Sequence, residues 1–235
     1  MSRVIAVIGA KGFVGGAICN ETKRRSEFEL VRVHRGDDIE NLIKKADVVI
    51  HAANPSKRYF AERNPQVDFV ESVEKTYRIK QSAKKKKLIL ISSISARTQL
   101  YTVYGRNRRA CEMIADDPQN LIVRLGPMFG GDKNVGALHD ILVNNPVYVS
   151  EKTKYAYVNI EYNGKKILDF IDYTGLIEIG AKNSIELREL KEILGSSSEF
   201  TGPDDTQIPL NPQPDTPDAR DVISFALSIK DKGAI

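Results

Sequence analysis

Residues 3–15 read Arg3-Val4-Ile5-Ala6-Val7-Ile8-Gly9-Ala10-Lys11-Gly12-Phe13-Val14-Gly15, and this stretch decides the fold. Its first six residues are mostly apolar and β-branched, which is typical of a strand buried on both faces. Three glycines follow at a G-x-x-G-x-x-G spacing, directly before a helical pattern. Glycine lets the backbone turn tightly and approach a ligand closely, and a helix N-terminus attracts anions. The stretch therefore predicts a cradle for the pyrophosphate of a dinucleotide.

The spacing of these glycines leaves an alternative open. One residue more separates Gly9 from Gly12 than in the usual dinucleotide-binding fingerprint. A glycine motif on its own is also compatible with a tight strand-to-helix turn that holds no ligand.

Strand-like apolar runs alternate with helical patterns through the first half of the chain. This alternation predicts an α/β fold, a doubly wound parallel Rossmann-type sheet with helices on both faces. The strands are expected at residues 3–8, 28–33, 47–53, 88–91 and 121–125. Ligands of such sheets bind at the carboxyl ends of the strands, where Gly9, Ala52 and Ser93 stand.

The chain is expected to form two parts. Residues 1–130 are assigned to a dinucleotide-binding domain and residues 131–235 to a small C-terminal substrate-binding subdomain, part of which can rejoin the sheet. Within the first part, residues 65–84 read as one long helix. Its apolar positions Val67, Val70, Val73 and Tyr77 are expected to face inward.

Composition narrows the function classes. The chain has 235 residues, 28% charged and 41% hydrophobic, and a net charge of +4, which is too small to argue for a nucleic-acid partner. The basic run Lys84–Lys87 is interpreted as a solvated loop. Two cysteines and three histidines show neither a disulfide framework nor metal-ligand spacing. Without a signal peptide or an apolar membrane span, we expect a cytoplasmic protein with no metal, membrane or nucleic-acid partner.

Catalytic chemistry is indicated by Tyr104 and Arg108, which lie one helical turn apart on the same face. A fixed cation favours the phenolate form of a nearby tyrosine, so Tyr104 is a candidate general acid/base. The hydroxyl of Ser93, at the end of a neighbouring predicted strand, is placed to orient a reacting oxygen. The alternative is a tyrosine at a helix start whose neighbouring arginines face water.

The cofactor preference is predicted from the residues after the second strand. A carboxylate there binds a ribose 2′-hydroxyl and repels a 2′-phosphate. The strand instead leads into His34-Arg35, and Lys11 stands in the glycine turn. Two cations near the ribose favour NADP over NAD, unless Arg35 simply faces water.

Five segments together resemble the extended, or atypical, short-chain dehydrogenases/reductases, in the NAD-dependent epimerase/dehydratase group. They are Gly9–Gly15, Asp47–Ala53, Ile91–Ser93, Tyr104–Glu112 and Arg124–Gly130, the last two being similar to the family's Tyr-x-x-x-Lys helix and Arg-Pro-Gly-x-x-Tyr-Gly segment. The chain departs from the family at Arg108, where the family has lysine, and at Ser72, where it usually has asparagine. The span between Val33 and Asp47 is also too short for the family's full second and third units, so a strand and a helix are expected to be missing.

The resemblance implies a function and a set of site residues. It implies hydride transfer between NADP, or NAD, and a nucleotide-sugar or similar carbonyl or hydroxyl substrate, by an oxidoreductase or epimerase that pairs into a homodimer through helices 65–84 and 105–114. The catalytic candidates are Ser93, Tyr104 and Arg108. The cofactor-binding candidates are Gly9, Lys11, Gly12, Phe13, Val14, Gly15, His34, Arg35, Ala52, Ala53, Ser92, Tyr104, Arg108, Gly126, Pro127 and Met128. Because arginine hardly releases a proton, the alternative is a catalytically degenerate NADP-binding sensor or scaffold.

Overall fold

The computed structural model describes residues 2–131, 136–212 and 215–231. It divides into two compact units. The first unit contains Met1–Leu125 and Glu161–Ile177, and the second contains Gly126–Ile160 and Glu178–Ile235. The first change of unit along the chain follows Leu125, and a segment from the C-terminal half belongs to the first unit.

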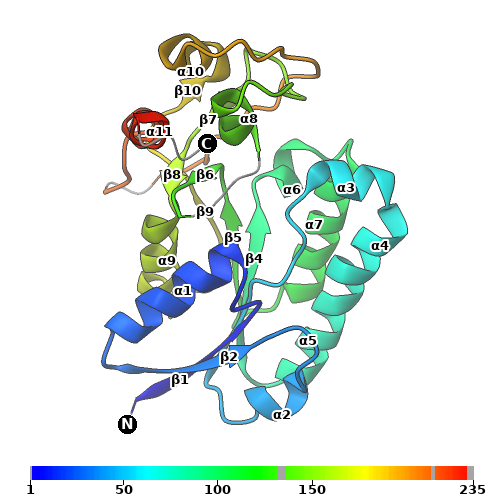
Figure 1. The fold of residues 1–235 in the computed structure, drawn as a ribbon. Helices are drawn as coiled ribbons and strands as arrows, with labels where there is room; N and C mark the ends of the chain where they lie inside the picture. Colours follow the sequence, from blue (N-terminus) through cyan, green and yellow to red (C-terminus); the bar gives the residue numbers. More distant parts are fainter. Residues whose placement is uncertain (1, 132–135, 213–214, 232–235) are drawn as a thin grey trace. The chain divides into compact units, whose positions relative to one another are not determined.

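A six-stranded parallel sheet forms the centre of the first unit, with strand order β2-β1-β3-β4-β5-β9 (Figure 1). The strands are β1 (Arg3–Ile8), β2 (Phe28–Val33), β3 (Val48–His51), β4 (Lys87–Ser93), β5 (Leu121–Leu125) and β9 (Gly175–Ile179). The register pairs Ile8 with both Val33 and His51, and Ser93 with Leu125. These residues end their strands, so the carboxyl ends form one edge of the sheet. The predicted α/β class and all five predicted strands are confirmed.

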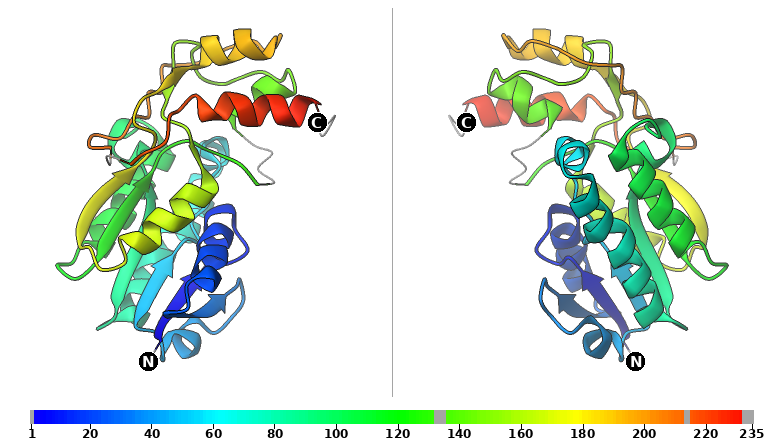
Figure 2. Two further views of the ribbon diagram at one scale, coloured as in Figure 1. Left: turned by 90° about the vertical axis from the view of Figure 1, so that its left-hand side faces the viewer. Right: turned by 90° about the vertical axis from the view of Figure 1, so that its right-hand side faces the viewer.

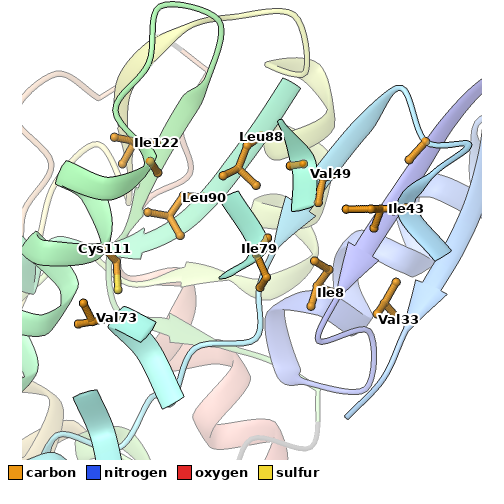
Figure 3. Packing of buried hydrophobic residues seen from close by; sticks show 14 residues of the cluster. Ile8, Val33, Ile43, Val49, Val73, Ile79, Leu88, Leu90, Cys111 and Ile122 are labelled. Carbon is orange, nitrogen blue, oxygen red and sulfur yellow. The ribbon is translucent and has the colours of Figure 1, made fainter. Parts of the chain in front are cut away.

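Helices cover both faces of this sheet (Figures 1 and 2). On one face lie α1 (Phe13–Arg24) and α9 (Ile160–Asp169), and on the other lie α2 (Ile39–Ile43), α5 (Lys75–Ala83) and α7 (Val103–Ala115). Figure 3 shows how the second group packs, with Ile43 of α2, Ile79 of α5 and Cys111 of α7 meeting the sheet residues Val49 and Leu90. This apolar layer fixes α5 and α7 against the strands that end in the candidate site.

The link between β2 and β3 is short, as expected. It holds α2 alone, and the side chain of Asp38 caps this helix by accepting a hydrogen bond from the Asn41 N–H at 3.1 Å. All residues of the link are described, and none forms an additional strand. The described link therefore contains one helix and no strand of its own.

The predicted helix 65–84 is three consecutive segments rather than one. They are α4 (Pro65–Phe69), the π-helix η1 (Val70–Glu74) and α5 (Lys75–Ala83). Three of the side chains expected inside are outside: Val67, Val70 and Tyr77 are 48%, 43% and 54% exposed. Only Val73 of that set is buried.

The buried face of these segments includes three polar residues, Asp68, Ser72 and Thr76, all fully enclosed, in addition to the apolar Val73, Ile79 and Ala83. The line of buried polar residues begins at Asp68, before the π-helix, and continues at four-residue spacing through Ser72 and Thr76. Two of these polar groups have local partners: Ser72 Oγ donates to the Asp68 carbonyl, and an Asp68 carboxylate oxygen accepts from Asn107 Nδ2 at 2.8 Å. The apolar periodicity of the sequence therefore predicts the wrong buried face for this stretch.

The second unit is built from short strands and helices. β6 (Met128–Phe129) pairs with β8 (Val158–Asn159), and β7 (Lys154–Tyr155) pairs antiparallel with β10 (Ile185–Glu186). Its described helices include α8 (Ala137–Leu142), α10 (Leu187–Leu194) and α11 (Asp221–Asp231), which enclose their own apolar core. No helix among the described residues is long and apolar enough to cross a membrane.

Candidate active site

The glycine turn joins β1 to α1 with a backbone that only glycine accepts easily. Gly9 has φ +88°, and a Cβ there would lie 2.8 Å from the Ala52 carbonyl oxygen. A Cβ on Gly15 would lie 2.1 Å from the Gly9 carbonyl oxygen. Helix α1 begins directly after Gly12, which has no side chain with which to cap it. Amide groups of the first turn of α1, at Phe13, Val14 and Gly15, therefore stand where an anion would be stabilised.

The loop after β3 packs on this turn and is held by His51, which sequence reasoning did not single out. The imidazole is fully buried. Its Nδ1 accepts from the Ala53 N–H at 3.3 Å, and its Nε2 lies 3.1 Å from Thr76 Oγ1. Burial, together with the positive charges of Arg108 and Lys75, lowers the pKa of His51 from 6.5 to about 3. His51 is therefore neutral, with its proton on Nε2, and fixes the backbone of Ala52-Ala53.

Helix α7 presents Tyr104 and Arg108 together. The side chain of Thr102 caps the helix by accepting from the Gly105 N–H at 2.9 Å. A Cβ on Gly105 would lie 2.1 Å from the Gln99 carbonyl oxygen, so this helix start packs directly on the loop after α6 (Ser95–Thr98). The Arg108 guanidinium carbon lies 4.8 Å from the centre of the Tyr104 ring, a cation–π contact.

Several buried polar atoms in this unit have no hydrogen-bond partner among the described residues, and those of Arg108 and Asn54 lie on either side of Pro55 in its contacts: Asn54 precedes it, and Arg108 binds its carbonyl. Arg108 is 3% exposed; its Nη2 donates to the Pro55 carbonyl, and its Nη1 has no acceptor. Neither side-chain polar atom of Asn54, which follows Ala53, has a partner. Leaving buried polar atoms unsatisfied is costly. This pair therefore marks a place where a polar ligand would be bound.

The two serines that end β4 have different surroundings. Ser92 is buried, and its hydroxyl donates to Glu112 Oε1 at 2.7 Å. Ser93 is partly exposed, and its Oγ accepts from the Ser95 N–H at 3.2 Å, which leaves its own O–H available to donate. The Ser92 side chain is thus committed to the protein, and Ser93 is the serine that can meet a substrate oxygen.

Glu112 is the centre of a buried charge network on the helix that carries Tyr104. It receives hydrogen bonds from Arg124 through Nε at 2.8 Å and Nη2 at 2.7 Å, and from Arg109 at 3.1 Å. Glu112 is 1% exposed and Arg124 is 7% exposed. The network ties α7 to β5 and to the end of β4, so it fixes the position of this helix.

Arg35 is 87% exposed, and its guanidinium pairs with Glu71 of η1 at 2.9 Å. Lys75 pairs with the same Glu71 oxygen at 2.5 Å and approaches the Ala53 carbonyl at 3.5 Å. The neighbouring His34 N–H donates to Asp37 Oδ2 at 2.7 Å, and Lys11 is exposed in the glycine turn.

Three cofactor-binding candidates belong to the second unit. The Gly126 N–H donates to the Ile179 carbonyl at 2.9 Å, the Pro127 carbonyl accepts from the Val158 N–H at 3.1 Å, and Met128 pairs with Val158 in β6–β8. Their role toward a cofactor stays a prediction.

The fold of this chain is similar to that of several enzymes of known structure. No protein-family model and no curated protein matches the sequence. Among solved structures, an NAD-dependent NDP-hexosamine 5,6-dehydratase, TunA, involved in tunicamycin biosynthesis, matches with a TM-score of 0.82 at 13% identity, covering 98% of each chain. The chain has the fold of the extended short-chain dehydrogenases/reductases.

Two further structures of this extended fold show the same likeness at low identity. UDP-glucuronic acid 4-epimerase from Bacillus cereus, a point mutant in complex with NAD and a fluorinated UDP-glucuronic acid, matches with a TM-score of 0.73 at 17% identity, over 94% of this chain and 93% of that one. dTDP-4-dehydrorhamnose reductase from Yersinia enterocolitica matches with a TM-score of 0.75 at 18% identity, over 97% and 99%. The resemblance proposed from the sequence is thereby confirmed for the fold.

Some residues that shape the site were missed by the sequence analysis. Asn54, Thr76 and His51 give no periodic signal and become informative only when the strand ends are assembled. Glu71 and Lys75 did carry a signal, since residues four apart on a helix with opposite charges form a pair. That pair is the part of the site that the sequence could have indicated.

Proposed function

We propose that the protein is an NAD(P)-dependent oxidoreductase or epimerase that acts on a nucleotide-sugar or a related carbonyl or hydroxyl substrate. One observation supports it above the others: the buried, unsatisfied Arg108 Nη1 lies beside Tyr104 in a unit that also presents the glycine turn. The three enzymes described above support it too, because their names specify nucleotide-linked sugars as what they act on or hold.

The residues present fit a nicotinamide dinucleotide. The glycine turn and the start of α1 would bind the pyrophosphate. The Asn54 side chain and Arg108 Nη1, which have no partner within the described residues, would form hydrogen bonds with ribose hydroxyls. When bound, the cofactor supplies a nicotinamide that accepts or donates a hydride. The exposed Lys11 and Arg35 support NADP, whereas the Glu71 carboxylate beside Arg35 opposes a second phosphate.

Within this proposal each catalytic candidate has one task. The Tyr104 hydroxyl takes a proton from the substrate oxygen or returns one to it, as a general acid/base. Ser93 donates its O–H to the same oxygen and holds it in place. Arg108, by its charge against the ring, favours the phenolate form of Tyr104, and it carries no proton in the reaction because arginine stays protonated.

The test starts from binding and then measures turnover. Purified protein is titrated with NADH and NADPH by fluorescence, and candidate nucleotide-sugars are then screened for product formation. Tyr104→Phe is expected to abolish turnover while leaving cofactor affinity within about twofold, since only the proton-transfer group is lost. Tyr101→Phe, which changes a tyrosine that is 60% exposed, is the matched control. Equal turnover of the two variants would contradict the assignment.

A second candidate function is a catalytically inert NAD(P)-binding sensor or scaffold. It is favoured by one contact: Arg108, at the family's lysine position, donates a hydrogen bond from Nη2 to the Pro55 carbonyl. Arg108→Lys separates the two candidates. A rise in turnover supports the enzyme, and a change confined to cofactor affinity supports the sensor.

The assembly we propose is a homodimer. Val67, Val70 and Tyr77, on α4, η1 and α5, and Met113 on the adjoining α7 are between 43% and 68% exposed. Large apolar side chains gathered on two neighbouring helices favour a protein partner, and a second copy is the one that the resemblance implies. Sedimentation equilibrium of the purified chain measures this directly, and a monomer at all concentrations would contradict it.

A further inference from the structure

The chain of ion pairs Arg35–Glu71–Lys75 connects the ends of two strands that lie on either side of β1. Arg35 stands two residues beyond the end of β2, and Lys75 reaches the carbonyl of Ala53, two residues beyond the end of β3. Glu71 joins both cations through one oxygen, at 2.9 Å and 2.5 Å. Since the sheet order is β2-β1-β3, these ion pairs span the strand ends on both sides of the glycine turn.

This is the part of the fold where the adenosine ribose is recognised. In dinucleotide-binding sheets a carboxylate after the second strand binds the 2′-hydroxyl, whereas an arginine there accommodates a 2′-phosphate. Here His34 and Arg35 stand at that position, and Asp37 is used by the His34 N–H. The carboxylate in contact with Arg35 comes instead from η1, and it is Glu71.

Glu71 is ionised and partly accessible, as a residue that binds a ribose hydroxyl must be. The hydrogen bond from Lys75 lowers the pKa of the Glu71 carboxyl, and Arg35 adds to the effect, so the group is a carboxylate at neutral pH. Its side chain is about one-third exposed, which leaves it open to a ligand. Two cations and one carboxylate are therefore coupled at the ribose end of the proposed cofactor site.

We propose that Glu71 determines cofactor preference: it binds the adenosine ribose in place of the missing strand-end carboxylate, and it retains Arg35 and Lys75, so that NAD is favoured over NADP. A 2′-phosphate would have to displace Glu71 from Arg35 and would then lie beside a like charge. With NAD the ion pairs stay intact. This inference rests on the proposed function, because it requires that the chain bind a nicotinamide dinucleotide.

The experiment compares NADH and NADPH affinities of the wild type and Glu71→Gln by fluorescence titration. We expect the wild type to bind NADH at least as tightly as NADPH. Glu71→Gln removes the negative charge and frees both cations, so it should shift the ratio of the two affinities toward NADPH by about tenfold or more. In the double variant with Arg35→Ala, most of that shift should be lost.

Glu74→Gln is the matched control, because Glu74 forms a similar pair with Arg78 further along the same helical stretch. It should leave the affinity ratio unchanged. If both cofactors bind and Glu71→Gln leaves the ratio unaltered, or changes it no more than Glu74→Gln does, this inference is overturned and the proposed function stands. If a folded wild type binds neither dinucleotide, the proposed function fails and this inference with it.

Discussion

Replacing His51 by glutamine should flatten the pH dependence of the free energy of unfolding between pH 7.5 and pH 5.0. The folded imidazole has a pKa of about 3, against 6.5 as the ordinary value expected in the unfolded chain. Below pH 6.5 the unfolded state therefore binds a proton that the folded state excludes, and stability falls as the pH falls toward 3. Because pH 5.0 lies about 1.5 pH units below the pKa of the unfolded group, the loss there is about 2 kcal/mol.

The assay is chemical denaturation followed by circular dichroism at a series of pH values. The wild type should lose about 2 kcal/mol over this range, and His51→Gln should lose much less, whatever its absolute stability. A wild type with constant stability, or a His51→Gln variant that follows the wild-type slope, would refute the reasoning.

Two further predictions concern the helix that carries Tyr104. Gly105→Ala should lower the free energy of unfolding by about 2 kcal/mol and reduce turnover, because the new Cβ would lie 2.1 Å from a backbone oxygen. Gly16→Ala is the control: its Cβ would lie 3.9 Å from the nearest backbone oxygen, so this variant should not lower the free energy of unfolding. In chemical denaturation, Glu112→Ala should lower the free energy of unfolding by about 3 kcal/mol, because the buried Arg124 loses its partner carboxylate. Glu74→Ala removes a partly exposed ion pair and should change the free energy of unfolding little.

The fold was predictable because buried parallel strands have a simple signature. Each of the runs 3–8, 28–33, 47–53, 88–91 and 121–125 is largely apolar, and each became a strand of the sheet. The glycine turn was equally predictable, because the spacing of its glycines and their position after a strand allow few backbone conformations. The placement of Tyr104 beside Arg108 followed from helix periodicity alone, and the structure brings the two side chains into contact.

The partners of the site residues were not predictable in this way. Ser92 and Ser93 are adjacent and chemically identical, and only the buried Glu112 shows which hydroxyl is already committed. Arg35 reads as a free cation until Glu71, 36 residues later, is placed beside it. Such pairings depend on which loops the sheet order brings together. Periodicity within one segment carries no information about that order.

The stretch around the π-helix η1 contains both the main failure of the sequence analysis and part of the site's chemistry. A uniform 3.6-residue period would have turned Val67, Val70 and Tyr77 inward, but burial follows the line of Ser72 and Thr76. That orientation gives His51 its partner Thr76 and sets Glu71 against Arg35. It also leaves large apolar side chains in water, an arrangement from which a single folded chain gains nothing. Because this stretch buries its polar line and exposes Val67, Val70 and Tyr77, one orientation accounts both for the polar contacts inside the unit and for the surface that we assign to a second copy.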